Sequence, residues 1–429
     1  MKYDEALEWL FSLENMGIKL GLDRMQDLMA ALGNPERSFR SVHVAGTNGK
    51  GSVCAMLASI FQEAGLVTGL YTSPHLVDFE ERIQVQGAMV PKVEVAALAE
   101  EIRQIVESPE FPKGRRLTFF EITTAIAFLH FKRKGVQMAV VEVGMGGRLD
   151  ATNVIEPLCT VITRISLEHT QHLGDTVAKI AFEKAGIIKE NVTVITAETD
   201  ETALRVIDAV ARDHAAPLLV AGREFDFKVT ASGWDGIMVR LGSIDGTVKV
   251  PLVGAFQASN AAMACECALD VSVKSVRIRE KDISSGLSKV IWPGRIEVVS
   301  ERPRIVFDVS HTPDGAKVVA DELKMLHDGR WVLVLGVLDD KDIEGIAGTF
   351  GGMASKAIAT SPKTKRAYPA ETVAKALREH CDDVTVVSDV GAAIDEAIES
   401  CMPGEAILVT GSLYMIGEAK EWLEQRRRR

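Results

Sequence analysis

Short apolar runs alternate along this chain with stretches in which apolar residues recur every three to four positions. The runs in the first half favour β-strands and lie at residues 41–45, 66–71, 139–143, 160–165 and 192–196. Between them, helical spacing is clearest at 53–64 and at 176–184. This strand–helix alternation predicts a doubly wound parallel sheet.

The pattern changes twice further along the chain. From about 225 to 253 helical spacing disappears and short alternating runs follow, which predicts a small β subdomain before a helix at 257–270. Trp292-Pro293-Gly294-Arg295 is the expected hinge, because proline and glycine punctuate it. Strands are expected again at 305–309, 331–335, 357–360, 384–387 and 406–410. We therefore expect an α/β protein of two doubly wound domains, residues 1–294 and 295–429.

Composition narrows the class of protein. The 429 residues carry 49 basic and 60 acidic side chains, a net charge of −11, which argues against nucleic acid as a partner. The sequence has no run of about 18 purely apolar residues, so no membrane-spanning helix is expected. Asp4, Glu5 and Glu8 stand where a signal peptide would be basic, so a cytoplasmic protein is expected. The six cysteines are scattered without CxxC pairs, as expected of inert thiols in a reducing compartment.

The sharpest local feature follows the first expected strand. It is a glycine-rich turn between strand and helix, in which backbone N–H groups and the helix N-terminus can surround phosphate. A lysine there can reach the outer phosphates and a hydroxyl can ligate magnesium. The expected phosphate-binding residues, which the family resemblance below assigns to ATP, are Gly46, Thr47, Asn48, Gly49, Lys50, Gly51 and Ser52. The general GxxxxGK[ST] pattern is not met, because Val44 occupies the first glycine position and Gly51 follows the lysine.

Polar residues also mark the ends of expected strands. Glu142 interrupts an apolar strand near its carboxyl end, where ligands collect in open α/β sheets, and a carboxylate there can hold magnesium. Ser73 and His169 each follow another strand. From the residues alone, a structural ion pair, a turn serine and a loop histidine remain open alternatives. The run Gly144 to Gly147 is not a dinucleotide fingerprint, because Leu149 stands where GxGxxG needs glycine.

The turn AGTNGKGS at 45–52 resembles the phosphate loop of the Mur ligase superfamily, and its GKGS ending resembles the folylpolyglutamate synthase branch. Similar motifs follow in order at 71–76, 81–83, 118–121, 142–153, 168–170, 183–189, 293–295, 339–342 and 411–414. The chain is thus identified as a member of this family of ATP-dependent amide-forming ligases. The resemblance implies an N-terminal Mur-ligase-like P-loop ATPase domain and a C-terminal, Rossmann-like glutamate-ligase domain.

The resemblance also implies the cofactors. Ser73, Glu142 and His169 match magnesium ligands of the family, and Lys184 matches a lysine that is carbamylated to N6-carboxylysine. A carbamate binds magnesium where an ammonium would repel it, and burial makes the required neutral amine available. Further ATP contacts are expected at three positions in the second part of the chain, Asn260, Arg295 and Asp308.

The implied reaction joins L-glutamate to a pterin acid, either dihydropteroate or a folate, after ATP converts the acid into an acyl phosphate. Lys50, Lys184 and His311 are the expected catalytic residues, and Ser412 matches a residue near the amino-acid pocket. The pterin is expected to lie on Thr118, Phe119, Phe120, Glu121, Leu149, Asp150 and Ala151. Dihydrofolate synthase activity, folylpolyglutamate synthase activity or both would follow, in an enzyme expected to be a monomer.

One motif departs from the family. Residues 308–313 read DVSHTP where the family has DGAHNP. Valine cannot take the positive φ open to glycine, and Thr312 lacks an amide, so a different local backbone and an uncertain amine substrate are expected. Three alternatives stay open: a Mur-type ligase acting on a cell-wall nucleotide or another carboxylate, a regulatory ATPase without ligase chemistry, and a non-catalytic binding protein.

Overall fold

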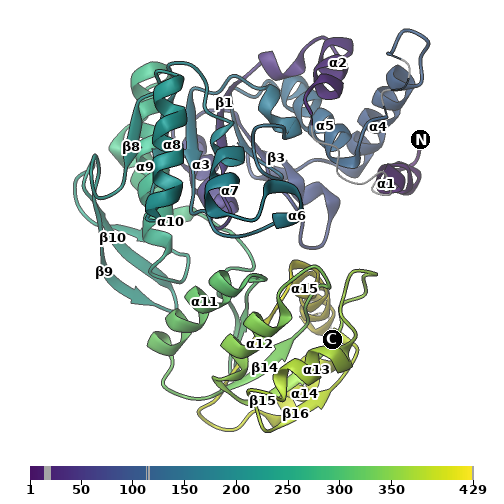
Figure 1. Cartoon of the computed structure of the whole chain (residues 1–429), viewed down its shortest axis with the longest axis vertical. Coiled ribbons are helices and arrows are strands. Elements are labelled where there is room, and N and C mark those ends of the chain that lie inside the picture. The colour runs from purple at the N-terminus through teal and green to yellow at the C-terminus, as the bar shows by residue number, and fades with distance from the viewer. Residues whose placement is uncertain (14–20, 113, 115, 428–429) are drawn as a thin grey trace.

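The computed structural model describes residues 1–13, 21–112, 114 and 116–427 (Figure 1). It contains an eight-stranded sheet, a three-stranded sheet and a six-stranded sheet. The eight-stranded sheet belongs to the first half of the chain and the six-stranded sheet to the second half. The three-stranded sheet lies on one side of the molecule, between the two larger bodies (Figure 1).

The eight-stranded sheet has the order β4-β3-β2-β5-β1-β6-β7-β8. Its strands are β1 Arg40–Ala45, β2 Thr68–Tyr71, β3 Ile83–Val85, β4 Ala88–Met89, β5 Met138–Glu142, β6 Cys159–Ile162, β7 Thr193–Thr196 and β8 Leu218–Val220. The strands β2, β5, β1, β6, β7 and β8 are parallel. The parallel sheet was predicted from the first five of these strands, and the edge strand β8 was not predicted. The antiparallel edge β3–β4 was not predicted. Gln86 and Gly87 connect it with φ values of 53° and 75°, and positive φ at both central residues is typical of a tight hairpin turn.

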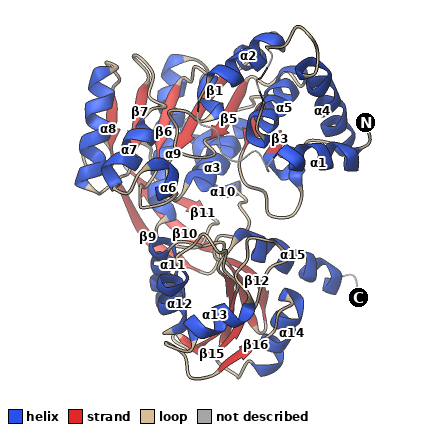
Figure 2. Ribbon diagram, turned by 45° about the vertical axis from the view of Figure 1, so that its right-hand side comes forward, coloured by secondary structure: helices blue, strands red, loops and turns tan. Residues whose placement is uncertain are grey.

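Helices cover both faces of this sheet (Figure 2). Val140 faces a core formed with α3 and α9, whereas its neighbours Ala139 and Val141 face a core formed with α5. Burial on both faces explains why these strands read as continuous apolar runs. The helices are α1 Tyr3–Ser12, α2 Asp23–Ala31, α3 Lys50–Glu63, α4 Lys92–Val106, α5 Phe119–Arg133, α6 Thr170–Leu173, α7 Val177–Ala185, α8 Glu201–Asp213, α9 Gln257–Lys274 and α10 Glu280–Lys289.

The predicted β subdomain is a three-stranded antiparallel sheet. Its strands are β9 Phe227–Gly233, β10 Gly236–Leu241 and β11 Val248–Val250, in the order β11-β10-β9. The turn between β9 and β10 holds Trp234 and Asp235. The helix expected at 257–270 is present as α9 and continues about one turn further than predicted.

The six-stranded sheet has the order β12-β13-β17-β14-β15-β16. Its strands are β12 Glu297–Glu301, β13 Arg304–Phe307, β14 Trp331–Leu335, β15 Ala354–Ala359, β16 Val384–Val386 and β17 Ala406–Thr410. All pairings are parallel except that of the edge strand β12, which was not predicted because its side chains are largely half-buried. The helices are α11 Pro313–Leu326, α12 Ile343–Gly351, α13 Ala370–Leu377, α14 Val390–Ser400 and α15 Leu413–Arg427.

The boundary expected at residue 294 lies in the segment between α10 and β12. Gly294 there has a φ of 75°, and Ile296 is fully buried with a φ of 45°, which is costly for a β-branched residue. None of the described helices is both long and apolar enough to cross a bilayer.

Candidate active site

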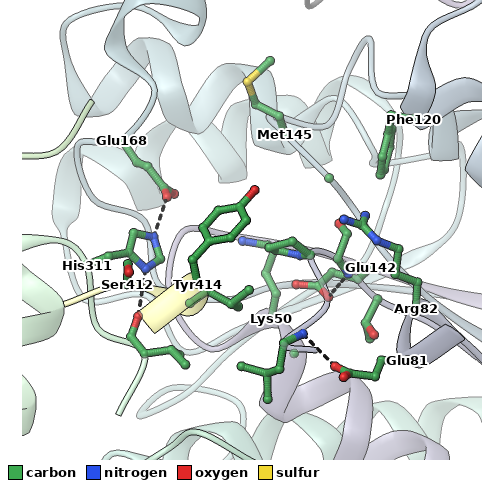
Figure 3. A pocket seen from close by; sticks show the side chains of 18 of the residues that line it. Lys50, Glu81, Arg82, Phe120, Glu142, Met145, Glu168, His311, Ser412 and Tyr414 are labelled. Carbon is green, nitrogen blue, oxygen red and sulfur yellow. Dashed lines mark hydrogen bonds and ion pairs between the residues drawn. The ribbon is translucent and has the colours of Figure 1, made fainter. Parts of the chain in front are cut away.

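A cavity of about 790 Å³ lies where the two halves of the chain face each other (Figure 3). Its walls combine residues from the carboxyl ends of strands in the first sheet with the loops that follow β13 and β17 in the last sheet. The cavity brings together most of the predicted site residues: Thr47, Asn48, Lys50, Gly51, Ser73, Thr118, Phe119, Phe120, Glu121, Glu142, Leu149, Asp150, Ala151, His169, Lys184, Arg295, His311 and Ser412.

Five predicted residues, Gly46, Gly49, Ser52, Asn260 and Asp308, are not among the described residues of the cavity wall. Two of them shape the loop instead. A Cβ on Gly46 would lie 1.8 Å from the Thr163 hydroxyl, and one on Gly49 would lie 2.7 Å from the Asn260 amide oxygen. Their φ values of 147° and 97° also require glycine. The glycines thus let the loop pack closely, and the N–H groups of Thr47 and Asn48 hold it by donating to the Arg164 carbonyl at 2.8 and 3.2 Å.

Lys50 is the first residue of α3, three positions before the predicted helical spacing at 53–64, because Gly49 at positive φ forms the N-cap. Its ammonium group donates to the backbone carbonyls of Gly46 at 3.0 Å and Thr47 at 3.1 Å. Both acceptors are neutral, so an anionic ligand in the loop would bind this cation more strongly.

Lys184, on α7, is buried rather than extended to water. Its Nζ donates to the same Gly46 carbonyl at 2.6 Å. Burial, with a smaller contribution from the nearby Lys50, lowers the pKa of Lys184 to about 7. A substantial share of this side chain is therefore a neutral amine at neutral pH.

The three expected metal ligands come from the ends of β2, β5 and β6. The buried Glu142 carboxylate accepts a hydrogen bond from the backbone N–H of Ser73 at 3.1 Å, and burial raises its pKa. His169 begins α6 with a φ of 51°, and burial lowers its pKa to about 4, so its imidazole is neutral. A neutral imidazole, a carboxylate and a hydroxyl suit a divalent cation. Among the described residues, no three His, Cys, Asp or Glu side chains form such a group by themselves.

One end of the cavity is aromatic. Phe119 lies under the Arg82 guanidinium, 5.3 Å from the ring centre, and Phe120 packs against Gly144, where a Cβ would lie 2.4 Å from the ring. Glu121 forms a capping box with Thr118 and an ion pair with Arg24 at 3.0 Å. No role was predicted for Arg82, whose only signal in the sequence is its place within the 81–83 motif.

Asp150 shapes the loop on the same side of the cavity. Its carboxylate accepts hydrogen bonds from the backbone N–H groups of Met145 at 2.9 Å and Thr152 at 3.0 Å. Burial raises the pKa of Asp150. This residue therefore holds the 144–152 turn in place, in addition to lining the cavity.

Residues 309–312, in the loop after β13, form the opposite wall. The buried Asp308 carboxylate accepts backbone hydrogen bonds from Ile296 at 3.0 Å and Ser310 at 2.8 Å. Val309 is not among the residues with positive φ. Thr312 caps α11 by accepting from the Gly315 N–H at 3.1 Å. The departures from the family pattern are thus accommodated without strain at Val309.

His311 links the two halves of the cavity. Its Nδ1 lies 2.9 Å from the Val309 carbonyl oxygen, and its Nε2 lies 3.5 Å from a carboxylate oxygen of Glu168 (Figure 3). Burial opposes ionisation of Glu168, but hydrogen bonding to His311 and the nearby Lys50 outweigh it and lower its pKa. Glu168 was noted only as part of a motif, because this contact joins residues 143 positions apart. Ser412 lies on the cavity wall and accepts a hydrogen bond from the Met415 N–H, and Tyr414 beside it extends into the cavity (Figure 3).

Comparisons with known proteins identify the family of this chain. The Mur ligase middle domain model matches residues 44–268, and the Mur ligase glutamate ligase domain model matches residues 294–413. The chain is 37% identical to the dihydrofolate synthase/folylpolyglutamate synthase of Bacillus subtilis, over 98% of this chain and 99% of that relative. The chain belongs to the dihydrofolate synthase/folylpolyglutamate synthase family. The Escherichia coli member is 34% identical over 98% of this chain and 96% of its own length.

Solved structures of the family share the whole fold. Mycobacterium tuberculosis folylpolyglutamate synthase complexed with ADP has a TM-score of 0.90 and 31% identity, covering 98% of this chain and 99% of its own. Escherichia coli FolC in complex with DHPP and ADP has a TM-score of 0.88 and 33% identity, with 98% of both chains covered. The predicted fold class and the predicted ATP-dependent ligase class of this family are confirmed. A related structure from Yersinia pestis is complexed with AMPPNP and a Mn ion, with a TM-score of 0.86 and 29% identity over 99% of this chain and 98% of its own.

Proposed function

We propose that this protein joins L-glutamate to the carboxyl group of a pterin acid, accepting both dihydropteroate and folates that already carry glutamate. The observation that carries the proposal is one cavity whose wall combines two unlike parts. Lys50 and Glu142 line it together with residues of the glycine-rich loop, and Phe119, stacked on Arg82, gives the same wall an aromatic part. A flat pterin ring suits the aromatic end, and a triphosphate suits the loop. Several relatives carry both activities in their names.

Lys50 and the loop amides would hold the ATP phosphates. A substrate carboxylate oxygen attacks the γ-phosphorus and ADP leaves, which forms an acyl phosphate. The glutamate amine then attacks the acyl carbon, loses a proton and expels phosphate, which completes the amide. Because two anions meet in the first step, positive charge and alignment are the main contributions of the chain. The walls from the two domains would keep water from the acyl phosphate.

Ser73, Glu142 and His169 would hold Mg²⁺, the divalent ion that we propose for this site. When bound, the ion neutralises charge on the phosphate oxygens. Their fit rests on the buried carboxylate of Glu142, which has a hydrogen bond from one N–H of Ser73, and on a neutral imidazole on the same cavity wall. The contacts of Arg295, Asn260 and Asp308 with nucleotide remain predictions. Asn260 lies against Gly49, which places it behind the loop.

We also propose that Lys184 is carbamylated. Its neutral amine would add to carbon dioxide, forming a nitrogen–carbon bond and releasing a proton, and the product is an anion in place of a cation. Burial and a pKa of about 7 favour this addition. Nuclear magnetic resonance with ¹³C-bicarbonate should give a carbamate signal in the wild type and none in Lys184→Arg. Absence of the signal in a fully active preparation would contradict the carbamate.

The central test is a product assay. The protein is incubated with ATP, Mg²⁺, labelled L-glutamate and either dihydropteroate or a folate monoglutamate, and the pterins are separated by chromatography. Labelled products from both acids are expected. Turnover only with a muramyl nucleotide would assign a cell-wall ligase instead, and ATP hydrolysis without any acid would assign a regulatory ATPase.

We further infer that the enzyme works as a monomer in the cytoplasm. All six cysteines are free and five of them are buried, as in proteins of reducing compartments. Size-exclusion chromatography with light scattering would check the monomer, and fractionation of cells would check the compartment. A stable dimer in solution would overturn the first inference.

A further inference from the structure

The hairpin β9–β10 contacts the C-terminal domain at a place separate from the active cavity (Figure 1). Trp234, in its turn, donates from Nε1 to the carbonyl of Leu326, the last residue of α11, at 3.1 Å. The Trp234 ring lies 4.3 Å from the Arg304 guanidinium carbon and 6.4 Å from the Trp331 ring centre. The hairpin turn therefore inserts a large aromatic side chain between two elements of the other domain.

A buried carboxylate lies next to this contact. Glu322 is 3% exposed and lies one helical turn before Leu326 on α11. Its two oxygens accept from the Ser232 hydroxyl at 3.0 Å and from the Ala255 N–H at 2.9 Å. Both donors belong to the N-terminal domain, residues 1–294. Burying a carboxylate costs free energy, so its two hydrogen bonds across the domain boundary make this a defined attachment rather than incidental packing.

The two partners of this attachment lead directly to the two walls of the cavity. Ala255 lies two residues before α9, whose Asn260 lies against Gly49 of the phosphate loop. Helix α11 begins at Pro313, two residues after His311 on the opposite wall. With 14 residues, α11 spans about 21 Å from the attachment to the cavity. The covalent link between the domains is one segment, which by itself leaves their orientation free.

We propose that Ser232, Trp234 and Glu322, which we name the hairpin anchor, position α11 so that the loop before it faces the phosphate loop. These three are positioning residues, because none of them lines the active cavity. The anchor fixes the far end of α11, and the hinge around Gly294 and Ile296 fixes the start of β12. The anchor and the contact of Leu76 with Gly417 on α15 add to the hinge in defining the orientation of the domain, whereas the hinge alone does not. The kinetic part of the test below rests on the proposed function.

The test compares Trp234→Ala, Glu322→Gln and Trp234→Phe with the wild type. Lys228→Ala, on the exposed face of the same hairpin, is the matched control. Small-angle X-ray scattering measures the distribution of interatomic distances. Ligase assays measure kcat and the KM for glutamate, and a binding titration measures the Kd for ATP. Thermal unfolding checks that each variant is folded. If one of the larger substitutions prevents folding, Ser232→Ala, which removes one hydrogen bond, takes its place in the comparison.

We expect Trp234→Ala and Glu322→Gln to broaden the distance distribution and to lower kcat about 10- to 100-fold, because small misplacements of reacting groups are costly. The Kd for ATP should change less than threefold. Trp234→Phe keeps an aromatic ring at this position and should retain most of kcat. Lys228→Ala should match the wild type. Unchanged scattering and unchanged kcat in folded Trp234→Ala and Glu322→Gln would overturn the anchor. If the wild type forms no product, the proposed function fails, and scattering still decides on the anchor.

Discussion

Two loops face each other across the active cavity, and they use opposite hydrogen-bonding chemistry. At the phosphate loop, the side-chain amino groups of Lys50 and Lys184 donate to one backbone carbonyl, that of Gly46. At the loop after β13, the backbone N–H groups of Ile296 and Ser310 donate to the carboxylate of Asp308. The first loop thus holds the Lys50 cation with neutral acceptors, whereas the carboxylate of the second loop is bound by backbone N–H groups.

Because of this difference, the first loop is suited to binding a ligand and the second to positioning a residue. Cations that contact only carbonyls gain charge-assisted hydrogen bonds when a phosphate arrives, so the first loop can exchange its contacts for a ligand. Asp308 cannot leave its two N–H donors without leaving them unpaired, which costs free energy. The second loop therefore keeps its shape and presents His311 to the cavity.

The largest effect is expected from removing a cation of the first loop. Lys50→Ala should lower kcat by about 10²- to 10³-fold, because one preorganised group that stabilises developing charge contributes about that much. Thermal unfolding should change little, since the ammonium contacts only two carbonyls. Product chromatography measures the loss, and Lys281→Ala, an exposed lysine on α10, is the control. Retention of more than a tenth of kcat in Lys50→Ala would contradict the comparison.

A second prediction concerns the strands that lead into the loops. β1 carries the fully buried His43, whose pKa burial lowers to about 3, whereas β13 ends in three apolar residues. As pH falls below about 6.5 the unfolded chain binds a proton at this histidine and the folded chain does not, so the free energy of unfolding decreases. His43 should account for a loss of about 2 kcal/mol between pH 7.5 and 5.0.

Urea unfolding at the two pH values measures this loss. His43→Gln should show a smaller decrease than the wild type, because glutamine does not titrate. His172→Gln, at an exposed position, should show the same decrease in the free energy of unfolding as the wild type. An identical decrease in wild type and His43→Gln would refute the assignment.

The smallest effect is expected in the second loop. Thr312→Ala removes the cap of α11 and should lower the free energy of unfolding by about 1 kcal/mol. Thr312→Asn retains a capping oxygen, so its stability should stay close to that of the wild type. Urea unfolding measures both. If the alanine and asparagine variants are equally destabilised, the capping role of Thr312 is wrong.

Much of the fold was predictable because its signals are local. The strands β14 and β17 were predicted with their observed bounds, since apolar runs between turns identify buried parallel strands. The edge strands β3, β4 and β12 were missed, because short or half-exposed strands lack such runs. Helix α5 was not predicted as a helix of the core, since it is apolar on nearly all sides and shows no clear helical period.

The residues of the candidate site likewise differ in how far the sequence predicts them. The phosphate loop and the residues at strand ends were found because each lies in a recognisable segment. The pairing of Glu168 with His311 and the stacking of Arg82 on Phe119 depend on folding, because each brings together residues distant in sequence. The shared carbonyl of Gly46 likewise joins Lys50 to Lys184, and no spacing in the sequence indicates it.

Helix α11 has one end at the cavity and the other among the contacts of Trp234 and Glu322. Such a helix acts as a lever. For a length of about 21 Å, a tilt of about 5° at the far end displaces its start by about 2 Å, a large fraction of a hydrogen-bond length. Changes at a hairpin remote from any substrate can therefore be magnified into the geometry of amide formation.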